Sequence, residues 1–215
     1  MISFYIVRHG ETLLNSLNRA QGWSDSPLTA AGVQTAADLG HKLREIHFDA
    51  VYTSDMLRAV QTAEIILAAS QNADIPIQKD TRLREWCLGS MDAENNTLFL
   101  QNVSHWLGGV SSLRELNQRL PEVANAIRQH DTTGMAETFR DISNRLKGIF
   151  MEIAKDNLNK SSYHVLVVTH AFSIKTLFYL FAPEQLSTVC KLENASISRL
   201  DYDGEAVSLE PNLIL

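Results

Sequence analysis

Two histidines and two arginines follow apolar segments that are typical of buried strands. Arg8 and His9 come directly after the apolar run 3–7, His170 follows a second such run, and Arg58 lies at the start of a helical pattern. The carboxyl ends of parallel strands meet at one edge of a sheet, so we expect these side chains to lie together. Arginine binds phosphate oxygens in a fork and stays charged at any working pH. These residue types therefore predict a phosphate site.

The same segments supply the reactive groups for phosphoryl transfer. A neutral imidazole can attack phosphorus directly, and neighbouring arginines lower the pKa of a histidine so that its lone pair stays available. A departing alkoxide needs a proton, which the carboxyl group of Glu85 can supply from the segment after a further strand. A helix that begins at Ala171 would direct backbone N–H groups toward the same anion.

Four motifs in this order resemble the histidine phosphatase superfamily, also called the phosphoglycerate mutase-like family. They are Arg8-His9-Gly10-Glu11-Thr12, the stretch 54–63 around Arg58, Leu83-Arg84-Glu85, and Thr169-His170-Ala171. Asn15 and the stretch 21–29, which begins Gln21-Gly22, also match the family's spacing after the first motif. The resemblance extends over essentially the whole chain.

The resemblance implies a role for each of these residues. His9 would be the nucleophile that accepts the phosphoryl group, and Glu85 would be the proton donor. The phosphate pocket around His9 would be formed by Arg8, Arg58 and His170. Further contacts to the phosphate or the substrate would come from Asn15, Gln21, Gly22 and Ala171.

Two segments depart from the family pattern. The family commonly has a Glu-Gly pair after the glutamate motif, whereas this sequence has Asp92-Ala93. The family's Pro-Gly-Gly-Glu-Ser stretch is replaced by 131–138, of which only the final Glu137-Thr138 resembles it. We expect both changes to lie where the leaving group is selected and neither to touch the phosphate pocket. They would then affect the choice of substrate rather than the type of reaction.

Strands and helices alternate along the chain. Apolar runs predict strands at 3–7, 50–53, 75–78, 165–169, 196–202 and 205–209, with an Asp203-Gly204 hairpin between the last two. Apolar stripes with helical spacing predict helices around 33–46, 56–67, 139–153 and 171–181. Such alternation predicts an α/β fold, a three-layer α/β/α sandwich with a mostly parallel central sheet, and the phosphoglycerate mutase-like resemblance implies the same architecture.

The segment 89–134 differs from the rest of the chain. Its periodicity is weak, Gly108-Gly109 break it, and Pro121 interrupts it. We interpret this segment as a cap or insertion within a single domain that spans 1–215. A chain of 215 residues suits one α/β domain better than two small ones.

Composition excludes several classes of protein. A formal net charge of −6 argues against a nucleic-acid or membrane-surface partner. Two cysteines predict no disulfide framework, and no cluster has metal-ligand spacing, so we expect neither metal nor cofactor. The N-terminal apolar run is too short for a signal peptide or a membrane span, and we expect a cytoplasmic protein. The sequence leaves a homodimer open.

These observations predict a metal-independent phosphate monoester hydrolase that acts through a phosphohistidine on a small phosphorylated metabolite. A phosphoglycerate mutase, the first alternative, needs a second cationic phosphate site. The segment 89–134 offers only Arg114, Arg119 and Arg128 and no lysine, which favours the hydrolase. Its mainly apolar residues at 98–107 suit packing or an uncharged leaving group. A non-catalytic phospholigand-binding module is the second alternative. The presence of His9 with its partners argues against it, because binding alone does not require a nucleophile.

Overall fold

The structure, a computed structural model, describes residues 1–110, 112–186, 191–211 and 213. Within these residues the centre is a six-stranded sheet with the order β3-β2-β4-β1-β5-β6. The strands are β1 (Ile2–Arg8), β2 (Ala50–Thr53), β3 (Ile77–Lys79), β4 (Tyr163–Thr169), β5 (Ile197–Tyr202) and β6 (Val207–Glu210). The strands β1 to β4 pair in parallel, and the hairpin of β5 and β6 joins β1 in antiparallel fashion, which confirms the mostly parallel sheet.

One strand is shifted along the chain relative to the prediction from the sequence. The run 75–78 predicts the third strand, but β3 begins at Ile77. The amide of Ile75 instead closes a turn by donating to the carbonyl of Asn72 over 3.2 Å. The shift is possible because β3 is an edge strand that pairs only with β2, so its position depends on one neighbour.

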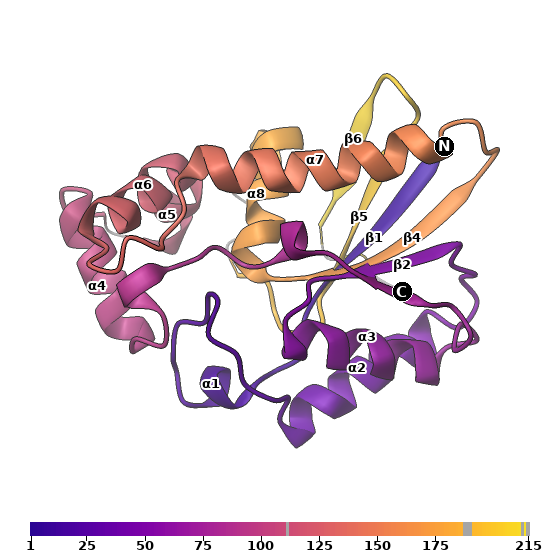
Figure 1. Cartoon of the computed structure of the whole chain (residues 1–215), viewed down its shortest axis with the longest axis horizontal. Helices are drawn as coiled ribbons and strands as arrows, with labels where there is room; N and C mark the ends of the chain where they lie inside the picture. Colours follow the sequence, from indigo (N-terminus) through magenta and orange to yellow (C-terminus); the bar gives the residue numbers. More distant parts are fainter. Residues whose placement is uncertain (111, 187–190, 212, 214–215) are drawn as a thin grey trace.

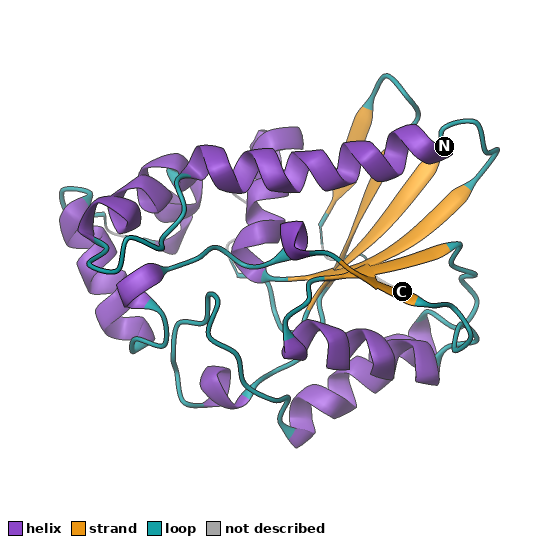
Figure 2. Cartoon of the chain, viewed as in Figure 1, coloured by secondary structure: helices purple, strands orange, loops and turns teal. Residues whose placement is uncertain are grey.

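Helices cover both faces of the sheet, as Figures 1 and 2 show. One face carries α2 (Ala30–Lys42) and α3 (Leu57–Ala69), and the other carries α7 (Phe139–Asn157) and α8 (Ala171–Phe181). Alternate residues of β1 supply the two cores: Phe4 and Ile6 pack in the core beneath α7 and α8, whereas Tyr5 and Val7 pack in the core beneath α2 and α3. The three-layer sandwich is therefore confirmed.

The segment between the third strand and α7 is more helical than its sequence pattern indicates. It forms the short 3₁₀ turns η1 (Thr81–Leu83) and η2 (Gly89–Met91), followed by α4 (Asn96–Trp106), α5 (Leu113–Gln118) and α6 (Leu120–His130). Pro121 does not interrupt a helix, because it lies in the first turn of α6, where its missing N–H has no helical partner to lose. In Figure 1 these helices lie beyond the sheet, next to the amino-terminal end of α7.

Two short helical segments complete the chain: α1 (Leu13–Ser16) after β1, and the 3₁₀ turn η3 (Pro183–Gln185) after α8. Among the described residues, no helix combines the length and the apolar character that crossing a membrane would require.

The sheet order explains why distant motifs meet. β1 and β4 are parallel neighbours in a register that pairs Arg8 with Thr169, so the residues that follow both strands emerge side by side. The amide of His9 donates to the carbonyl of Thr169 over 3.0 Å, which continues the ladder by one residue. β2 is the next neighbour of β4, and α3 follows it closely. The carboxyl edge of the sheet therefore gathers His9, His170 and Arg58.

Candidate active site

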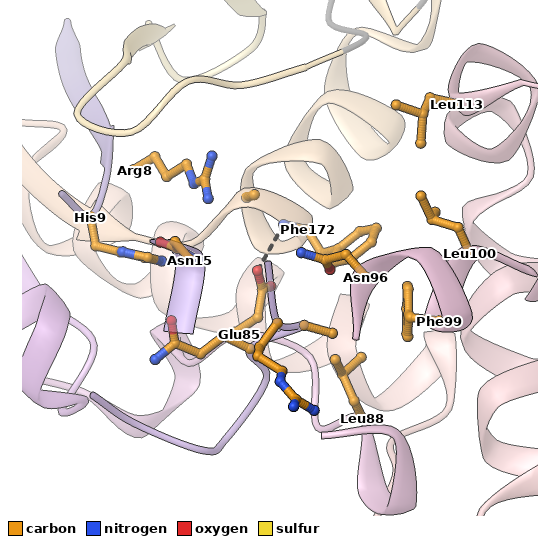
Figure 3. A pocket seen from close by; sticks show the side chains of 14 residues that line it. Arg8, His9, Asn15, Glu85, Leu88, Asn96, Phe99, Leu100, Leu113 and Phe172 are labelled. Atoms are coloured by element: carbon orange, nitrogen blue, oxygen red, sulfur yellow. Dashed lines mark hydrogen bonds between the residues drawn. The ribbon is translucent and has the colours of Figure 1, made fainter. Parts of the chain in front are cut away.

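His9 lies at the end of β1 and is 3% exposed. Its Nδ1 lies 2.8 Å from the carbonyl oxygen of Gly10. A carbonyl can only accept, so Nδ1 carries the hydrogen and Nε2 keeps an unshared electron pair. In Figure 3 the ring of His9 points into a cavity that Arg8 and Glu85 also line. The backbone thus fixes the tautomer of His9 and leaves the unprotonated Nε2 toward the cavity.

The charge state of His9 also suits a nucleophile. Burial lowers the pKa of His9 well below its ordinary value of 6.5, and the positive charges of Arg58 and Arg8 lower this pKa further. The hydrogen bond to Gly10 opposes these effects only in part. The imidazole is therefore neutral near pH 7, with its lone pair available.

His170 has the opposite tautomer. Its Nδ1 accepts a hydrogen bond from Nε of Arg58 over 3.1 Å, so the hydrogen is on Nε2. This Nε2 is buried and has no partner within the described ranges. Burial, followed by the charge of Arg58, lowers the pKa of His170 well below 6.5. A buried donor without an acceptor is costly, and an oxygen of a bound phosphate would satisfy it. The ring centroids of His9 and His170 are 5.2 Å apart, which places this donor beside the ring of His9.

Arg58 lies in the first turn of α3 and is completely buried. Besides the bond to His170, its guanidinium donates to the carbonyls of Gly22 (2.7 Å) and Ser24 (2.9 Å) and to the carboxylate of Asp25 (3.0 Å). These four bonds use four of the five N–H donors, so at most one is left for a phosphate. Arg58 therefore serves the site mainly as a fixed positive charge beside both histidines.

The loop 22–25, whose oxygens accept the hydrogen bonds of Arg58, is held in place by Asp92. The carboxylate of Asp92 accepts from the amides of Gly22 (3.0 Å), Trp23 (2.7 Å) and Ser24 (3.1 Å). The sequence places Asp92 where the leaving group is selected, but it does not line the cavity and instead supports the phosphate end from behind. The other departure, 131–138, also contributes no residue to the lining.

Gly22, expected to contact the substrate, also lies behind the site rather than along the cavity. A Cβ atom at this position would lie 2.6 Å from the carbonyl oxygen of Trp86 and 2.7 Å from a carboxylate oxygen of Asp92. Both distances are too short for real contacts. The absence of a side chain therefore lets this loop approach the segment after Glu85 and present its carbonyl to Arg58.

Arg8 supplies the charge that faces the cavity. One terminal nitrogen donates to the carbonyl of Leu192 over 2.5 Å, while its buried Nε has no partner in the described part of the chain. Figure 3 shows its guanidinium above the cavity, between His9 and Phe172. Arg8 and the Nε2–H of His170 together offer unsatisfied donors to an anion next to His9.

Glu85 lines the cavity and is 3% exposed. Its carboxylate accepts from the amides of Trp86 (3.0 Å), Phe172 (3.0 Å) and Ser173 (2.9 Å); Figure 3 marks the bond from Phe172. Burial raises the pKa of Glu85, although these amides and the charge of Arg58 act in the opposite direction. A carboxyl group with a raised pKa beside a nucleophile can act as a general acid.

The backbone N–H groups at the beginning of α8 therefore bind a different group from the phosphate that the sequence predicts. The sequence predicts that its backbone donors point toward the phosphate, but the amides of Phe172 and Ser173 donate to Glu85. Ala171 lines the cavity as expected. The positive end of the helix thus holds the carboxyl group in place rather than the phosphate itself.

Asn15 and Gln21, which the sequence predicts to contact the phosphate or the substrate, both line the cavity. The side-chain oxygen of Gln21 accepts from the hydroxyl of Thr12 over 2.7 Å, and that of Asn15 accepts from the amide nitrogen of Asn194 over 3.3 Å. The same nitrogen of Asn194 donates to the carbonyl of His9 over 3.1 Å. Asn194 thus links His9 to Asn15, and no signal in the sequence points to it because it lies in no recognisable motif.

Arg145 and Glu137 form a second layer behind Glu85. They make a two-bonded ion pair of 2.7 and 2.9 Å in which each side chain is 14% exposed. Arg145 also donates to the carbonyls of Arg84 (2.6 Å) and Glu85 (2.9 Å). This ion pair therefore holds the backbone of Glu85 in place. Glu137 belongs to the pair that resembles the family's Glu-Ser, whereas Arg145 gave no signal beyond a helical position.

The cavity has a volume of about 210 Å³ and extends from the phosphate end toward α4 and α5. The sequence predicts that the apolar stretch 98–107 suits packing or an uncharged leaving group, and Phe99 and Leu100 from it line this extension. The other residues along the extension gave no signal in the sequence; they are Arg19, Ala20, Leu88, Asn96, Leu113 and Phe172. The three arginines of segment 89–134 do not line it. Arg119 pairs with Glu122, and Arg128 donates to the carbonyl of Gly134.

The described residues contain no group of three or more His, Cys, Asp or Glu side chains arranged to hold a metal ion. The cationic side chains at the phosphate end are Arg8, which lines the cavity, and the buried Arg58 behind it, and their charges attract an anion.

Comparisons with known proteins show which family the chain resembles. The profile of the histidine phosphatase superfamily (branch 1) matches residues 4–211. The "Probable phosphoglycerate mutase GpmB" of Escherichia coli is 32% identical over 94% of this chain and 86% of its own. The crystal structure of a phosphoglycerate mutase from Bacillus anthracis superposes with a TM-score of 0.88 at 34% identity, covering 98% of this chain and 92% of that one.

A more distant structure shares the fold. Phosphoserine phosphatase from Entamoeba histolytica superposes with a TM-score of 0.72 at 23% identity, covering 100% of this chain and 98% of that one. The match of the superfamily profile to nearly the whole chain, together with the two relatives above 30% identity, establishes the family. The chain belongs to the histidine phosphatase superfamily.

Proposed function

We propose that this protein hydrolyses a phosphate monoester through a phosphohistidine on His9, without a metal ion. The observation that carries the proposal is the 2.8 Å contact between Nδ1 of His9 and the carbonyl of Gly10. It leaves the unprotonated Nε2 facing a cavity that also contains Arg8 and Glu85. Burial and two arginines keep this imidazole neutral, as a nucleophile requires.

In the first step, Nε2 of His9 attacks phosphorus in line with the leaving group. The N–P bond forms, the P–O bond to the leaving group breaks, and the carboxyl proton of Glu85 moves to the departing oxygen. Arg8 and the Nε2–H of His170 bind the oxygens that gain charge, and Arg58 adds its field from behind. Positioning and charge stabilisation of this kind dominate phosphoryl transfer.

In the second step, water attacks the phosphohistidine. The Glu85 carboxylate takes a proton from the water as the O–P bond forms, and the N–P bond to His9 breaks. Inorganic phosphate is released, and both side chains return to their starting states. The same carboxyl group thus acts first as an acid and then as a base.

A phosphoglycerate mutase is the second candidate, because two relatives above 30% identity carry that name. A mutase must also bind the second anionic group of a doubly phosphorylated intermediate. Beyond the phosphate end, Arg19 is the one cationic side chain among the described residues that line the cavity, and it is tied to the carbonyl of Ala93 by a 3.1 Å bond. The scarcity of positive charge beyond the phosphate end favours hydrolysis over transfer of the phosphoryl group back to a second hydroxyl.

Two assays on one preparation test the proposal. The first measures phosphate release from a broad panel of phosphorylated metabolites, with and without EDTA. The second follows interconversion of 2- and 3-phosphoglycerate with the bisphosphate primer present. We expect phosphate release that survives EDTA, with negligible interconversion. Mutase turnover comparable to hydrolysis would instead assign the protein to the second candidate, and a complete loss restored by a divalent ion would contradict the metal-free mechanism.

A further inference from the structure

The cavity changes character along its length. Figure 3 shows Arg8, His9 and Glu85 at one end, and Leu88, Phe99, Leu100 and Leu113 at the other, with Phe172 between them. The first end has the charges and donors that a phosphate needs. The second end, which we call the leaving-group end, is lined mainly by apolar side chains and is where the alcohol part of an ester would lie.

An aromatic wall gives the leaving-group end a fixed shape. The ring of Phe172 stacks on Trp86 with centroids 4.8 Å apart and an angle of 23°, and Phe99 packs at 6.4 Å from Phe172. Trp86 and Phe99 are 1% and 3% exposed, so both rings are held by the core. A rigid apolar wall favours the binding of a flat or branched apolar group, because that group displaces water from the wall.

Few polar groups face the same space. Apart from Arg8, His9 and Glu85, the described lining residues with polar side chains are Asn15, Arg19, Gln21 and Asn96. The side-chain oxygens of Asn15 and Gln21 already accept hydrogen bonds from other side chains, and Arg19 donates to the carbonyl of Ala93. A sugar or glycerate carries several hydroxyl or carboxylate groups, each of which loses water on entry and needs a partner. These few side chains, most of which already bond to the protein, cannot replace that hydration.

The size of the cavity limits the alcohol further. About 210 Å³ is below the 300–1,000 Å³ of sites for drug-sized ligands, so the space beyond the phosphate holds roughly one ring. From these observations, we infer that the leaving-group end selects an apolar, ring-sized alcohol. The substrate class is the phosphate monoester of an aromatic or branched apolar alcohol. This inference rests on the proposed hydrolase function.

Two esters of primary alcohols test the inference. Benzyl phosphate and glycerol 1-phosphate both release a primary alkoxide, so they differ chiefly in the apolarity of the leaving group. We expect kcat/KM for benzyl phosphate to be about ten- to a hundredfold higher, the factor expected from burying one apolar ring. Phosphate release is the readout for both.

A matched pair of variants localises the effect. Leu113 lines the leaving-group end and is 46% exposed, whereas Leu98 lies on α4 outside the cavity and is 49% exposed. Both positions tolerate a polar side chain without loss of the fold because they are on the surface. We expect Leu113→Gln to reduce the ratio of the two kcat/KM values about threefold, mainly through KM for benzyl phosphate. Leu98→Gln should leave the ratio unchanged.

The results that would refute the apolar selectivity differ from those that would refute the hydrolase function. Phosphate release from both esters with equal kcat/KM, or with glycerol 1-phosphate preferred, would overturn the apolar selectivity and leave the hydrolase intact. An equal change of the ratio in Leu113→Gln and Leu98→Gln would also overturn it. Absence of phosphate release from both esters and from the broad metabolite panel would refute the hydrolase and this inference with it.

Discussion

Arg58 donates its Nε–H to Nδ1 of His170 over 3.1 Å, and both side chains are completely buried. This contact fixes the hydrogen of His170 on Nε2, the atom that can then donate to a phosphate oxygen beside His9. The same arginine lowers the pKa of both histidines through its charge. One buried guanidinium thus sets the tautomer of one histidine and the charge state of two.

Arg58→Lys tests this coupling. Lysine keeps the charge but cannot donate at once to His170 and to the carbonyls of Gly22 and Ser24, because its donors are on one atom. We expect kcat to fall about 10²–10³-fold, as when a preorganised donor to the transition state is lost. Steady-state kinetics should be compared with Arg44→Lys, since Arg44 is exposed and forms its ion pair with the neighbouring residue Glu45. A kcat within twofold of wild type would contradict the coupling.

Glu85→Gln separates proton donation from the other contacts of this residue. Glutamine keeps the shape of the side chain but has no carboxyl proton to give. We expect turnover of an alkyl phosphate to fall by about 10²–10⁴-fold, and turnover of an activated aryl phosphate to fall much less, because its leaving group needs little protonation. Equal losses on the two esters would show that Glu85 supports the fold instead of donating a proton.

The pH profile of kcat/KM follows from two opposite pKa shifts. His9 must be neutral to attack, and its pKa is lowered, so activity should persist below pH 6.5 and fall only as the pH drops through that lowered pKa. Glu85 must be protonated, and its pKa is raised above 4.5, so activity should fall as the pH rises through that raised pKa. The alkaline fall should disappear in Glu85→Gln. An acid limb centred at or above pH 6.5 would contradict the assignment of His9.

The pair of Arg145 and Glu137 offers a prediction on stability. Arg145→Ala would leave Glu137 with an uncompensated, largely buried charge, and we expect the free energy of unfolding to fall by about 3 kcal/mol. Arg44→Ala, which removes an exposed pair, should cost less than about 1 kcal/mol. Urea unfolding measures both. Equal, small losses in the two variants would mean that the buried pair does not hold the segment of Glu85.

Much of the fold and the phosphate end could be predicted from the sequence, because both depend on local patterns. Apolar runs located β1, β2 and β4, and parallel strands bring the residues that follow them to one edge. His9 and His170 are therefore neighbours although far apart in the chain. The strand at 75–78 was misplaced by two residues because a turn at Asn72 uses the amide of Ile75, and composition does not reveal such a contact.

The supporting contacts could not be predicted, because they join residues that share no local pattern. Asn194 reaches His9 across 185 positions of sequence, and Asp92 reaches Gly22 across 70. Asp92 was noticed only as a departure from the family pattern, which suggested substrate selection and not support of the loop around Arg58. The leaving-group end could be predicted only in part. The apolar stretch 98–107 indicates packing or an uncharged leaving group, but the other walls come from the start of the chain, Leu88, α5 and α8, which share no local pattern with that stretch.

Trapping of a phosphoenzyme tests the central claim most directly. Brief incubation with a phosphate ester labelled on phosphorus, followed by quenching without acid, should leave label on His9. The label should be acid-labile and base-stable, as a phosphorus–nitrogen bond is, and mass spectrometry should locate it. His9→Ala should carry no label and lose turnover at least about 10⁴-fold, while retaining its fold by circular dichroism. Wild-type turnover by His9→Ala, or label on another residue, would contradict the account.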